Sequence, residues 1–207
     1  MIVAIDGPAG SGKSTVAKIV AERLGFKYIN SGAMYRAVAW KAHKTGFLLK
    51  DELSVAKFAK ELNIEFIPNI GGQKILIDGE DVGNKLKSEE VGNVAAIVAS
   101  QPQVRKALTN LQRKMGQQGK IIMEGRDIGT QVFPNADKKI FFQADPEERG
   151  KRRYKELLAK GESVELQKIV DQIRKRDLED MNRSIAPLIK AKDALVIDTT
   201  HLGIEEA

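Results

Sequence analysis

The sequence contains no cysteine and only two histidines, His43 and His201. Without cysteine there is no disulfide framework, no thiolate zinc site and no cysteine nucleophile. Two histidines alone supply too few imidazole ligands for a structural metal centre. The absence of cysteine therefore predicts a protein of a reducing compartment, in which metal plays no structural part.

Long apolar runs are also missing. The first residues, Met1–Asp6, carry no basic segment, and no stretch supplies the roughly 20 apolar residues that a membrane span needs. We therefore expect a cytoplasmic protein with no membrane partner.

Aromatic residues make up only 5% of the chain, whereas the formal net charge is +6. Residues 138–192 hold fifteen Lys and Arg against ten Asp and Glu, so most of the surplus lies in one segment. Such a segment can attract either polymer phosphate or the phosphates of a small molecule. With few aromatics, no face interleaves basic and aromatic residues in the manner of single-strand-binding proteins, so we expect no nucleic-acid partner.

Short apolar runs alternate with longer amphipathic runs over most of the 207 residues, a pattern typical of a parallel sheet with crossover helices. The alternation breaks between about 50 and 86, where two alternating runs flank Asn69–Gly72, a hairpin-like turn signal. This predicts a single domain with a small antiparallel insert at about 58–86 and a core at about 1–57 and 87–207. Strands are expected at 2–6, 28–30, 121–124, 139–143 and 195–198, and helices at 13–24, 32–45, 88–116, 146–159 and 163–181.

A phosphate-binding motif follows the first predicted strand directly. Residues 7–14 read Gly-Pro-Ala-Gly-Ser-Gly-Lys-Ser, which fits G-x-x-x-x-G-K-[ST], and a helical pattern opens at once. In such a loop the backbone N–H groups wrap the phosphates, Lys13 reaches the β and γ phosphates, and Ser14 can ligate Mg²⁺, partly through water. The sequence therefore predicts a three-layer P-loop NTPase fold with a five-stranded parallel sheet flanked by helices.

Arginines recur at positions that could meet a second anionic substrate. Ser31 could cap the helix that carries Tyr35 and Arg36, and Arg126 and Asp127 follow the third strand at the sheet edge where open α/β folds bind ligands. Two further sets share one helical face each, by spacings of three and four, and these are Arg149, Arg152 and Arg153, then Arg176, Asp180 and Arg183. Each set is also compatible with an ordinary solvated or salt-bridged surface.

Taken together, these motifs resemble the bacterial cytidylate kinases, within the nucleoside monophosphate kinases. The resemblance rests on the phosphate loop, Ser31–Arg36, Glu124–Thr130, Glu147–Arg149, Arg152–Arg153 and Arg176–Leu188, and it spans almost the whole chain. It implies transfer of the γ-phosphoryl group of ATP to CMP or dCMP with Mg²⁺, in pyrimidine nucleotide metabolism. It also implies that the insert binds the nucleoside monophosphate and that residues 146–162 form a short lid.

The resemblance assigns roles by position. Lys13, Arg126, Arg149, Arg153 and Arg176 would act in catalysis, and the ATP site would comprise Gly7, Pro8, Ala9, Gly10, Ser11, Gly12, Lys13, Ser14, Thr15 and Arg152. The CMP site would comprise Ser31, Tyr35, Arg36, Arg105, Arg126, Asp127, Arg176, Asp180 and Arg183. Within it, Arg105 and Asp127 would contact the cytosine and Asp180 the sugar. Ala96 stands where the family often has a serine that contacts the base, which makes selectivity against UMP a question for measurement.

Three alternatives remain open at this point. The chain could be a related phosphotransferase acting on AMP, UMP or shikimate, because these share the fold and the phosphate loop. It could be a nucleic-acid-binding ATPase that uses the basic segment, or a nucleotide-binding regulator without catalysis. We expect a monomer, since no long apolar stripe calls for a partner.

Overall fold

Five short strands form a parallel sheet in this computed structural model, which describes residues 1–46, 51–69 and 72–207. They are β1 (Ile2–Asp6), β2 (Lys27–Asn30), β6 (Ile121–Gly125), β7 (Lys138–Gln143) and β8 (Leu195–Asp198). The strand order is β2-β6-β1-β7-β8. In the register Asp6 of β1 lies opposite Phe141 of β7, and Ile140 of β7 opposite Leu195 of β8. The predicted fold class, with its five-stranded parallel sheet, is confirmed.

A second, antiparallel sheet is formed by β3 (Ile64–Asn69), β4 (Gly72–Ile77) and β5 (Glu80–Asp81). Ile64 lies opposite Ile77 and Asn69 opposite Gly72, so the two longer strands pair as a hairpin. This confirms the small antiparallel sheet that the alternating pattern predicts. The middle of the predicted turn, Ile70 and Gly71, lies outside the described residues.

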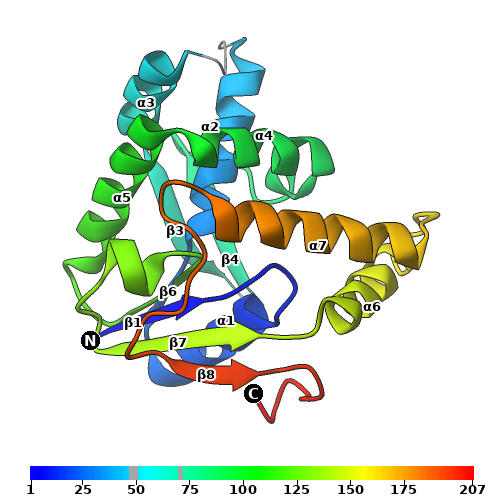
Figure 1. Cartoon of the computed structure of the whole chain (residues 1–207). Helices are drawn as coiled ribbons and strands as arrows, with labels where there is room; N and C mark the ends of the chain where they lie inside the picture. The colour runs from blue at the N-terminus through cyan, green and yellow to red at the C-terminus, as the bar shows by residue number, and fades with distance from the viewer. Residues whose placement is uncertain (47–50, 70–71) are drawn as a thin grey trace. The chain divides into compact units, whose positions relative to one another are not determined.

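The chain divides into two compact units. The first, called here the phosphate-loop unit, comprises Met1–Leu24 and Ile122–Ala207, and the second, called the insert unit, comprises Gly25–Ile121. In the phosphate-loop unit α6 (Pro146–Leu158) packs side by side with α7 (Leu166–Asn182) (Figure 1). Its core includes the fully buried side chains of Met123, Ile128 and Phe142. Met34 and Ile77 are fully buried in the insert unit, so each unit has an apolar core of its own.

The insert unit contains a break that the sequence pattern does not predict. One helix was expected over 88–116, but the structure has α4 (Glu89–Ser100) and α5 (Pro102–Gly116). Gln101 between them is extended, at φ −84° and ψ 118°. Proline has no N–H to continue a helix and disfavours helical geometry in the residue before it. Pro102 therefore ends one helix and occupies the first turn of the next.

A further helix, α3 (Glu52–Glu61), lies mostly before the predicted insert at about 58–86, where no helix was predicted. Its N-cap is Asp51, whose carboxylate accepts a hydrogen bond from the backbone N–H of Ser54. Val55, Ala56 and Ala59 are buried, and the helix packs against α5. The prediction for this segment was therefore incomplete.

The start of α2 (Ser31–Lys44) also differs from the prediction. Asn30, not Ser31, caps this helix, because the Asn30 side chain accepts the hydrogen bond of the Ala33 N–H at 2.9 Å. Ser31 is instead the first helical residue and is buried. Both residue types favour caps, so the motif placed the cap one residue too late.

Five smaller observations complete the fold. Helix α1 (Lys13–Leu24) follows the phosphate loop, α7 begins at Leu166 rather than at 163, and a 3-10 turn, η1, covers Lys85–Lys87. A π-helical turn, η2 (Ile128–Val132), follows β6. In the part of the chain that the structure describes, no helix pairs the length with the hydropathy that a membrane span requires.

Candidate active site

The phosphate loop connects β1 to α1 through residues whose backbone only glycine readily adopts. Gly7 has φ +149° and Gly12 has φ +83°. A Cβ atom on Gly7 would stand 2.3 Å from the carbonyl oxygen of Phe142, so no larger residue fits there. Glycines of this kind let successive backbone N–H groups turn toward one centre, where they can bind an anion.

Lys13 is buried at the first turn of α1, and its Nζ donates a hydrogen bond to the carbonyl oxygen of Pro8 at 2.8 Å. Burial, followed by the nearby charge of Arg126, lowers the pKa of Lys13 to about 7. Glu124, Asp6 and Asp180 act on this pKa in the opposite direction. The ammonium group thus lies among charged groups from three other segments of the phosphate-loop unit.

Ser14 provides a second polar group at the start of α1. Its hydroxyl donates to Glu124 Oε2 at 2.7 Å, and Glu124 is buried at the end of β6. A hydroxyl and a carboxylate are the oxygen donors that Mg²⁺ prefers, and Mg²⁺ needs only one or two protein ligands beside water and substrate phosphate. The described residues hold no cluster of three or more acidic or histidine ligands, so an all-protein metal cage is absent there. The Ser14–Glu124 pair fits a magnesium ion shared with a nucleotide.

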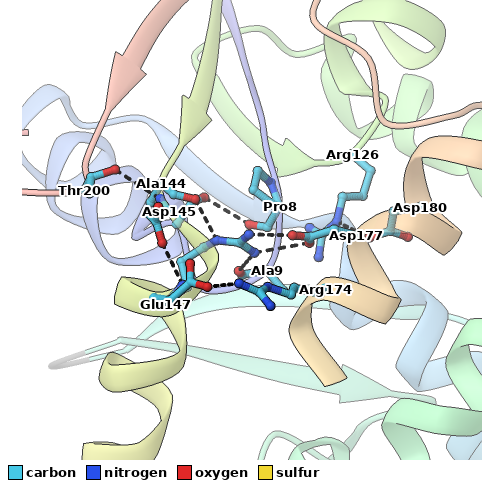
Figure 2. Close-up of polar contacts among 12 residues, drawn as sticks. Pro8, Ala9, Arg126, Ala144, Asp145, Glu147, Arg174, Asp177, Asp180 and Thr200 are labelled. Atoms are coloured by element: carbon cyan, nitrogen blue, oxygen red, sulfur yellow. Dashed lines mark hydrogen bonds and ion pairs between the residues drawn. The ribbon is translucent and has the colours of Figure 1, made fainter. Parts of the chain in front are cut away.

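Arg126 lies just beyond β6 in a cluster of opposite charges. Its Nε donates to Asp180 Oδ2 of α7 at 2.8 Å (Figure 2), and Arg183 forms an ion pair with Asp180 Oδ1 at 3.6 Å. Burial raises the pKa of Asp180, but the charges of Arg126, Arg183 and Arg176 and the Arg126 hydrogen bond outweigh burial, and the pKa lies below its usual value. Burial and the Arg126 charge lower the pKa of Arg176. The structure therefore brings four predicted site residues together.

Arg149, on the first turn of α6, is only 2% exposed. Its Nε donates to the Ala144 carbonyl at 2.9 Å, and Nη1 donates to the Ala9 carbonyl at 3.0 Å and to Asp177 Oδ1 at 3.1 Å. Nη2 donates to Asp177 Oδ2. Ala9, Ala144 and Asp177, which Figure 2 labels, are the residues whose oxygen atoms accept these hydrogen bonds. The guanidinium thus joins the phosphate loop, the turn after β7 and α7.

The two arginines one turn further along α6 have different surroundings. Arg152 is half-buried and donates to the carbonyl and hydroxyl oxygens of Thr199. Arg153 is exposed and forms an ion pair with Glu156 at 3.2 Å. The three arginines share one helical face, but in the structure they differ in how far they are buried.

In the insert unit, two predicted site residues, Tyr35 of α2 and Arg105 of α5, lie in contact. The guanidinium of Arg105 lies over the ring of Tyr35, 5.3 Å from its centroid, and its Nη1 donates to the Ala99 carbonyl at 2.9 Å. Arg36 Nη1 donates to the Leu86 carbonyl at 3.0 Å. A cation over the face of an aromatic ring is attracted by the ring, so Tyr35 and the Ala99 carbonyl together hold the Arg105 guanidinium.

Comparison with known proteins bears on the predicted site residues of both the phosphate-loop unit and the insert unit. The sequence profile described as cytidylate kinase matches residues 3–207. A cytidylate kinase of Geobacter sp. (strain M21) is 47% identical over 206 residues, which cover 100% of this chain and 88% of that protein. A cytidylate kinase of Clostridioides difficile (strain 630) is also 47% identical, over 100% of this chain and 94% of that protein. The chain belongs to the cytidylate kinase family.

This membership confirms the resemblance drawn from the motifs and makes the chain a phosphotransferase. Among solved structures, an uncharacterized protein from Eubacterium ventriosum ATCC 27560 matches with a TM-score of 0.53 and 13% identity, over 99% of this chain and 91% of that one. At that identity the likeness bears on the fold alone.

For this cytidylate kinase family member, sequence reasoning left three buried or half-buried carboxylates out of the predicted site. Asp6 is the last residue of β1, Glu124 accepts a hydrogen bond from Ser14, and Asp177 accepts hydrogen bonds from Arg149. A signal existed for the first two, since both lie at the carboxyl ends of predicted strands, where α/β folds bind ligands. Asp177 has only the spacing that it shares with other charged residues of α7, so no sequence feature distinguishes it from them.

Proposed function

We propose that this cytidylate kinase family member transfers the γ-phosphoryl group of ATP to CMP or dCMP, giving CDP or dCDP and ADP. The observation that carries the proposal is the cluster in the phosphate-loop unit, where Lys13 lies among the charges of Arg126, Asp180 and Glu124. A phosphate loop alone binds a nucleoside triphosphate, whereas added arginines supply a site for a second anion. Family membership assigns that second anion to the cytidine nucleotides.

ATP would be held by the loop itself, from Gly7 to Thr15, with Arg152 beside it. The buried Lys13 supports this assignment, because its Nζ lies within hydrogen-bond distance of the Pro8 carbonyl oxygen in the loop. Phosphate oxygens would replace that carbonyl and favour the charged form of the ammonium group. Mg²⁺, when bound by Ser14 and Glu124, would supply further neutralisation of phosphate charge.

CMP would be held by arginines that neutralise its phosphate and by groups that recognise the base and sugar. We assign its phosphate to Ser31, Tyr35, Arg36, Arg126 and Arg176, its base to Arg105 and Asp127, and its nucleoside to Asp180 and Arg183. The position of the Arg105 guanidinium over the Tyr35 ring supports Arg105 as a base contact, because it holds the guanidinium in place. Ala96 of α4 offers no hydroxyl to the base, so Arg105 and Asp127 would carry more of the selectivity.

Transfer needs no general base in this proposal, because the acceptor phosphate is already largely ionised near neutral pH. The loose transition state of phosphoryl transfer depends on positioning and on neutralised charge. Arg126 and Arg176 would hold the acceptor, while Lys13, Arg149 and Arg153 would act on the transferring group. Residues 146–162 would close as a lid and exclude water, which otherwise competes as an acceptor.

A panel of acceptors tests the function. ADP production from ATP and Mg²⁺ is followed with CMP, dCMP, UMP, AMP or shikimate, and without an acceptor. We expect CMP and dCMP to give turnover at least tenfold above AMP and shikimate. UMP turnover equal to that of CMP would assign relaxed selectivity to Ala96, whereas ADP release independent of any acceptor would contradict the proposal in favour of an ATPase.

Replacement of one arginine tests the acceptor clamp. Arg126→Ala removes a bidentate-capable cation from the proposed phosphate site, and we expect kcat/KM for CMP to fall by about a hundredfold or more. Arg23→Ala is the matched control, because Arg23 is exposed and pairs with Glu205. Steady-state kinetics of Arg126→Ala equal to those of Arg23→Ala would remove Arg126 from the site.

We also propose that the enzyme acts as a monomer in the cytoplasm, on small nucleotides alone. Light scattering on a size-exclusion column, at the protein concentration used for kinetics, measures the oligomeric state directly. A mass near twice 22.8 kDa would contradict the monomer.

A further inference from the structure

Asp6 is a buried carboxylate to which the proposed mechanism gives no role. It is the last residue of β1, stands directly before the phosphate loop and is only 5% exposed. Buried carboxylates are costly unless hydrogen bonds or charges compensate them. The partners of Asp6 therefore indicate what it does.

Both carboxylate oxygens of Asp6 accept backbone hydrogen bonds from one short segment. Oδ1 accepts from the Ile128 N–H at 2.8 Å, and Oδ2 accepts from the Gly129 N–H at 2.7 Å. These two amides open η2 and follow Arg126 and Asp127 by two residues. A Cβ atom on Gly129 would stand 3.3 Å from Asp6 Oδ2, so the glycine lets the segment come this close.

The same residue therefore fixes two loops of the phosphate-loop unit. Its backbone leads into the phosphate loop, and its side chain holds the segment that carries Arg126. Lys13 and Asp127 are the charged groups whose fields reach Asp6, the first from α1 and the second from the held segment. A carboxylate with a purely structural role could lie anywhere along β1. Asp6 instead connects the phosphate loop to the segment that carries Arg126.

We propose that Asp6 is a positioning residue for phosphoryl transfer, which sets the place of Arg126 relative to the phosphate loop through the amides of Ile128 and Gly129. The inference rests on the proposed function, in which Arg126 holds the acceptor phosphate. Asp6 itself touches no substrate in this account. Its contribution should therefore vanish when Arg126 is absent.

Asp6→Asn tests the inference at nearly constant shape. An amide side chain keeps one acceptor oxygen but presents an NH₂ group to the second backbone N–H, so one of the two bonds is lost. We expect kcat for CMP phosphorylation to fall about tenfold to a hundredfold. In an Arg126→Ala background the same change should lower kcat by less than about threefold, because interacting residues are not additive.

Asp137→Asn is the matched control. Asp137 Oδ2 also accepts a hydrogen bond from β1, from the Ile2 N–H at 2.6 Å, but at the opposite end of the strand and at the surface. We expect its kinetics to equal those of the wild type. A fall in kcat with Asp137→Asn as large as that with Asp6→Asn would overturn the inference, because any loosening of β1 would then suffice.

A second variant covers the case in which Asp6→Asn does not fold, as judged by circular dichroism and thermal unfolding. Gly129→Ala places a methyl group against the same carboxylate. We expect a twofold to tenfold fall in kcat that also depends on Arg126. Equal effects of either variant with and without Arg126 would overturn the inference while leaving the proposed function intact. Absence of CMP-dependent turnover in the wild type would instead contradict the proposed function, before any variant is compared.

Discussion

Two sets of charged side chains in the phosphate-loop unit differ sharply in their surroundings. The inner charges, defined here as Asp6, Arg149 and Asp177, are largely buried and hydrogen bonded to fixed partners. The outer pair, Arg153 and Glu156, lies on α6 with side chains 45% and 63% exposed. Arg149 and Arg153 are one helical turn apart and equivalent by sequence spacing. The comparison teaches that burial and partners, not spacing, separate a pre-organised arginine from a solvated one.

The largest expected effect tests the inner charges by removing one of them. Arg149→Ala leaves Asp177 without its bidentate partner, and loss of one member of a buried pair costs about 3 kcal/mol of unfolding free energy. Urea unfolding followed by circular dichroism measures the change. The double variant Arg149→Ala, Asp177→Ala should recover part of the loss, and a double variant as unstable as the two single effects combined would show that the pair does not act as a unit.

The next effect depends on pH and uses Asp6. Burial raises the pKa of Asp6 to about 6, from an ordinary value of 3.8. Between these values the folded chain retains a proton that the unfolded chain has lost, so unfolding releases a proton and becomes easier as the pH rises. From pH 4 to pH 6.5 the wild type should therefore lose about 2 to 3 kcal/mol relative to Asp6→Asn.

Asp198→Asn is the control for this titration. Hydrogen bonds from Thr200 and Gln143 lower the pKa of Asp198 to about 2, so its contribution to stability is lost only below about pH 4. Unfolding free energies of the three proteins, measured across pH 4 to 6.5, should separate Asp6→Asn from the other two. Parallel curves for all three would mean that Asp6 titrates like a surface carboxylate.

The contacts of such buried charged groups could not be predicted from the sequence. The phosphate loop could be predicted because its residues are neighbours in the chain, and the parallel sheet could be predicted because strand and helix patterns alternate along the chain. By contrast, Ser14 meets Glu124 across 110 positions and Asp6 meets Gly129 across 123. Such contacts depend on how the sheet assembles, which local spacing does not encode.

Helix boundaries illustrate the same limit at smaller scale. Pro102 and Asp51 each carry a local signal, a helix break in one case and an N-cap in the other, which the predictions for their segments did not use. Arg152 and Arg153 share a face with Arg149 by spacing, and contacts with the phosphate loop, α7 and Thr199 decide how far each of the three is buried. The burial of each arginine therefore could not be predicted from spacing.

A smaller effect tests the packing that buries Arg149. A Cβ atom on Gly150 of α6 would stand 2.4 Å from Val170 Cγ2 of α7, so Gly150→Ala should force the helices apart and cost about 1 to 2 kcal/mol of unfolding free energy. Gly92→Ala in α4 meets no atom within 4 Å and should stabilise by up to about 1 kcal/mol. If Gly150→Ala were as benign as Gly92→Ala, close helix packing would not explain the burial of Arg149.

The smallest effect on stability belongs to the outer pair. Arg153→Ala breaks an exposed ion pair, and solvent screening limits its contribution to less than about 0.5 kcal/mol of unfolding free energy. If Arg153 acts on the transferring phosphoryl group, kcat should nevertheless fall about tenfold, since its charge is then needed in the transition state and not in the fold. Lys155→Ala, an exposed cation on the same helix, should change neither quantity. A loss of stability above 1 kcal/mol with kcat unchanged would reverse the comparison, because Arg153 would then support the fold and not the transfer.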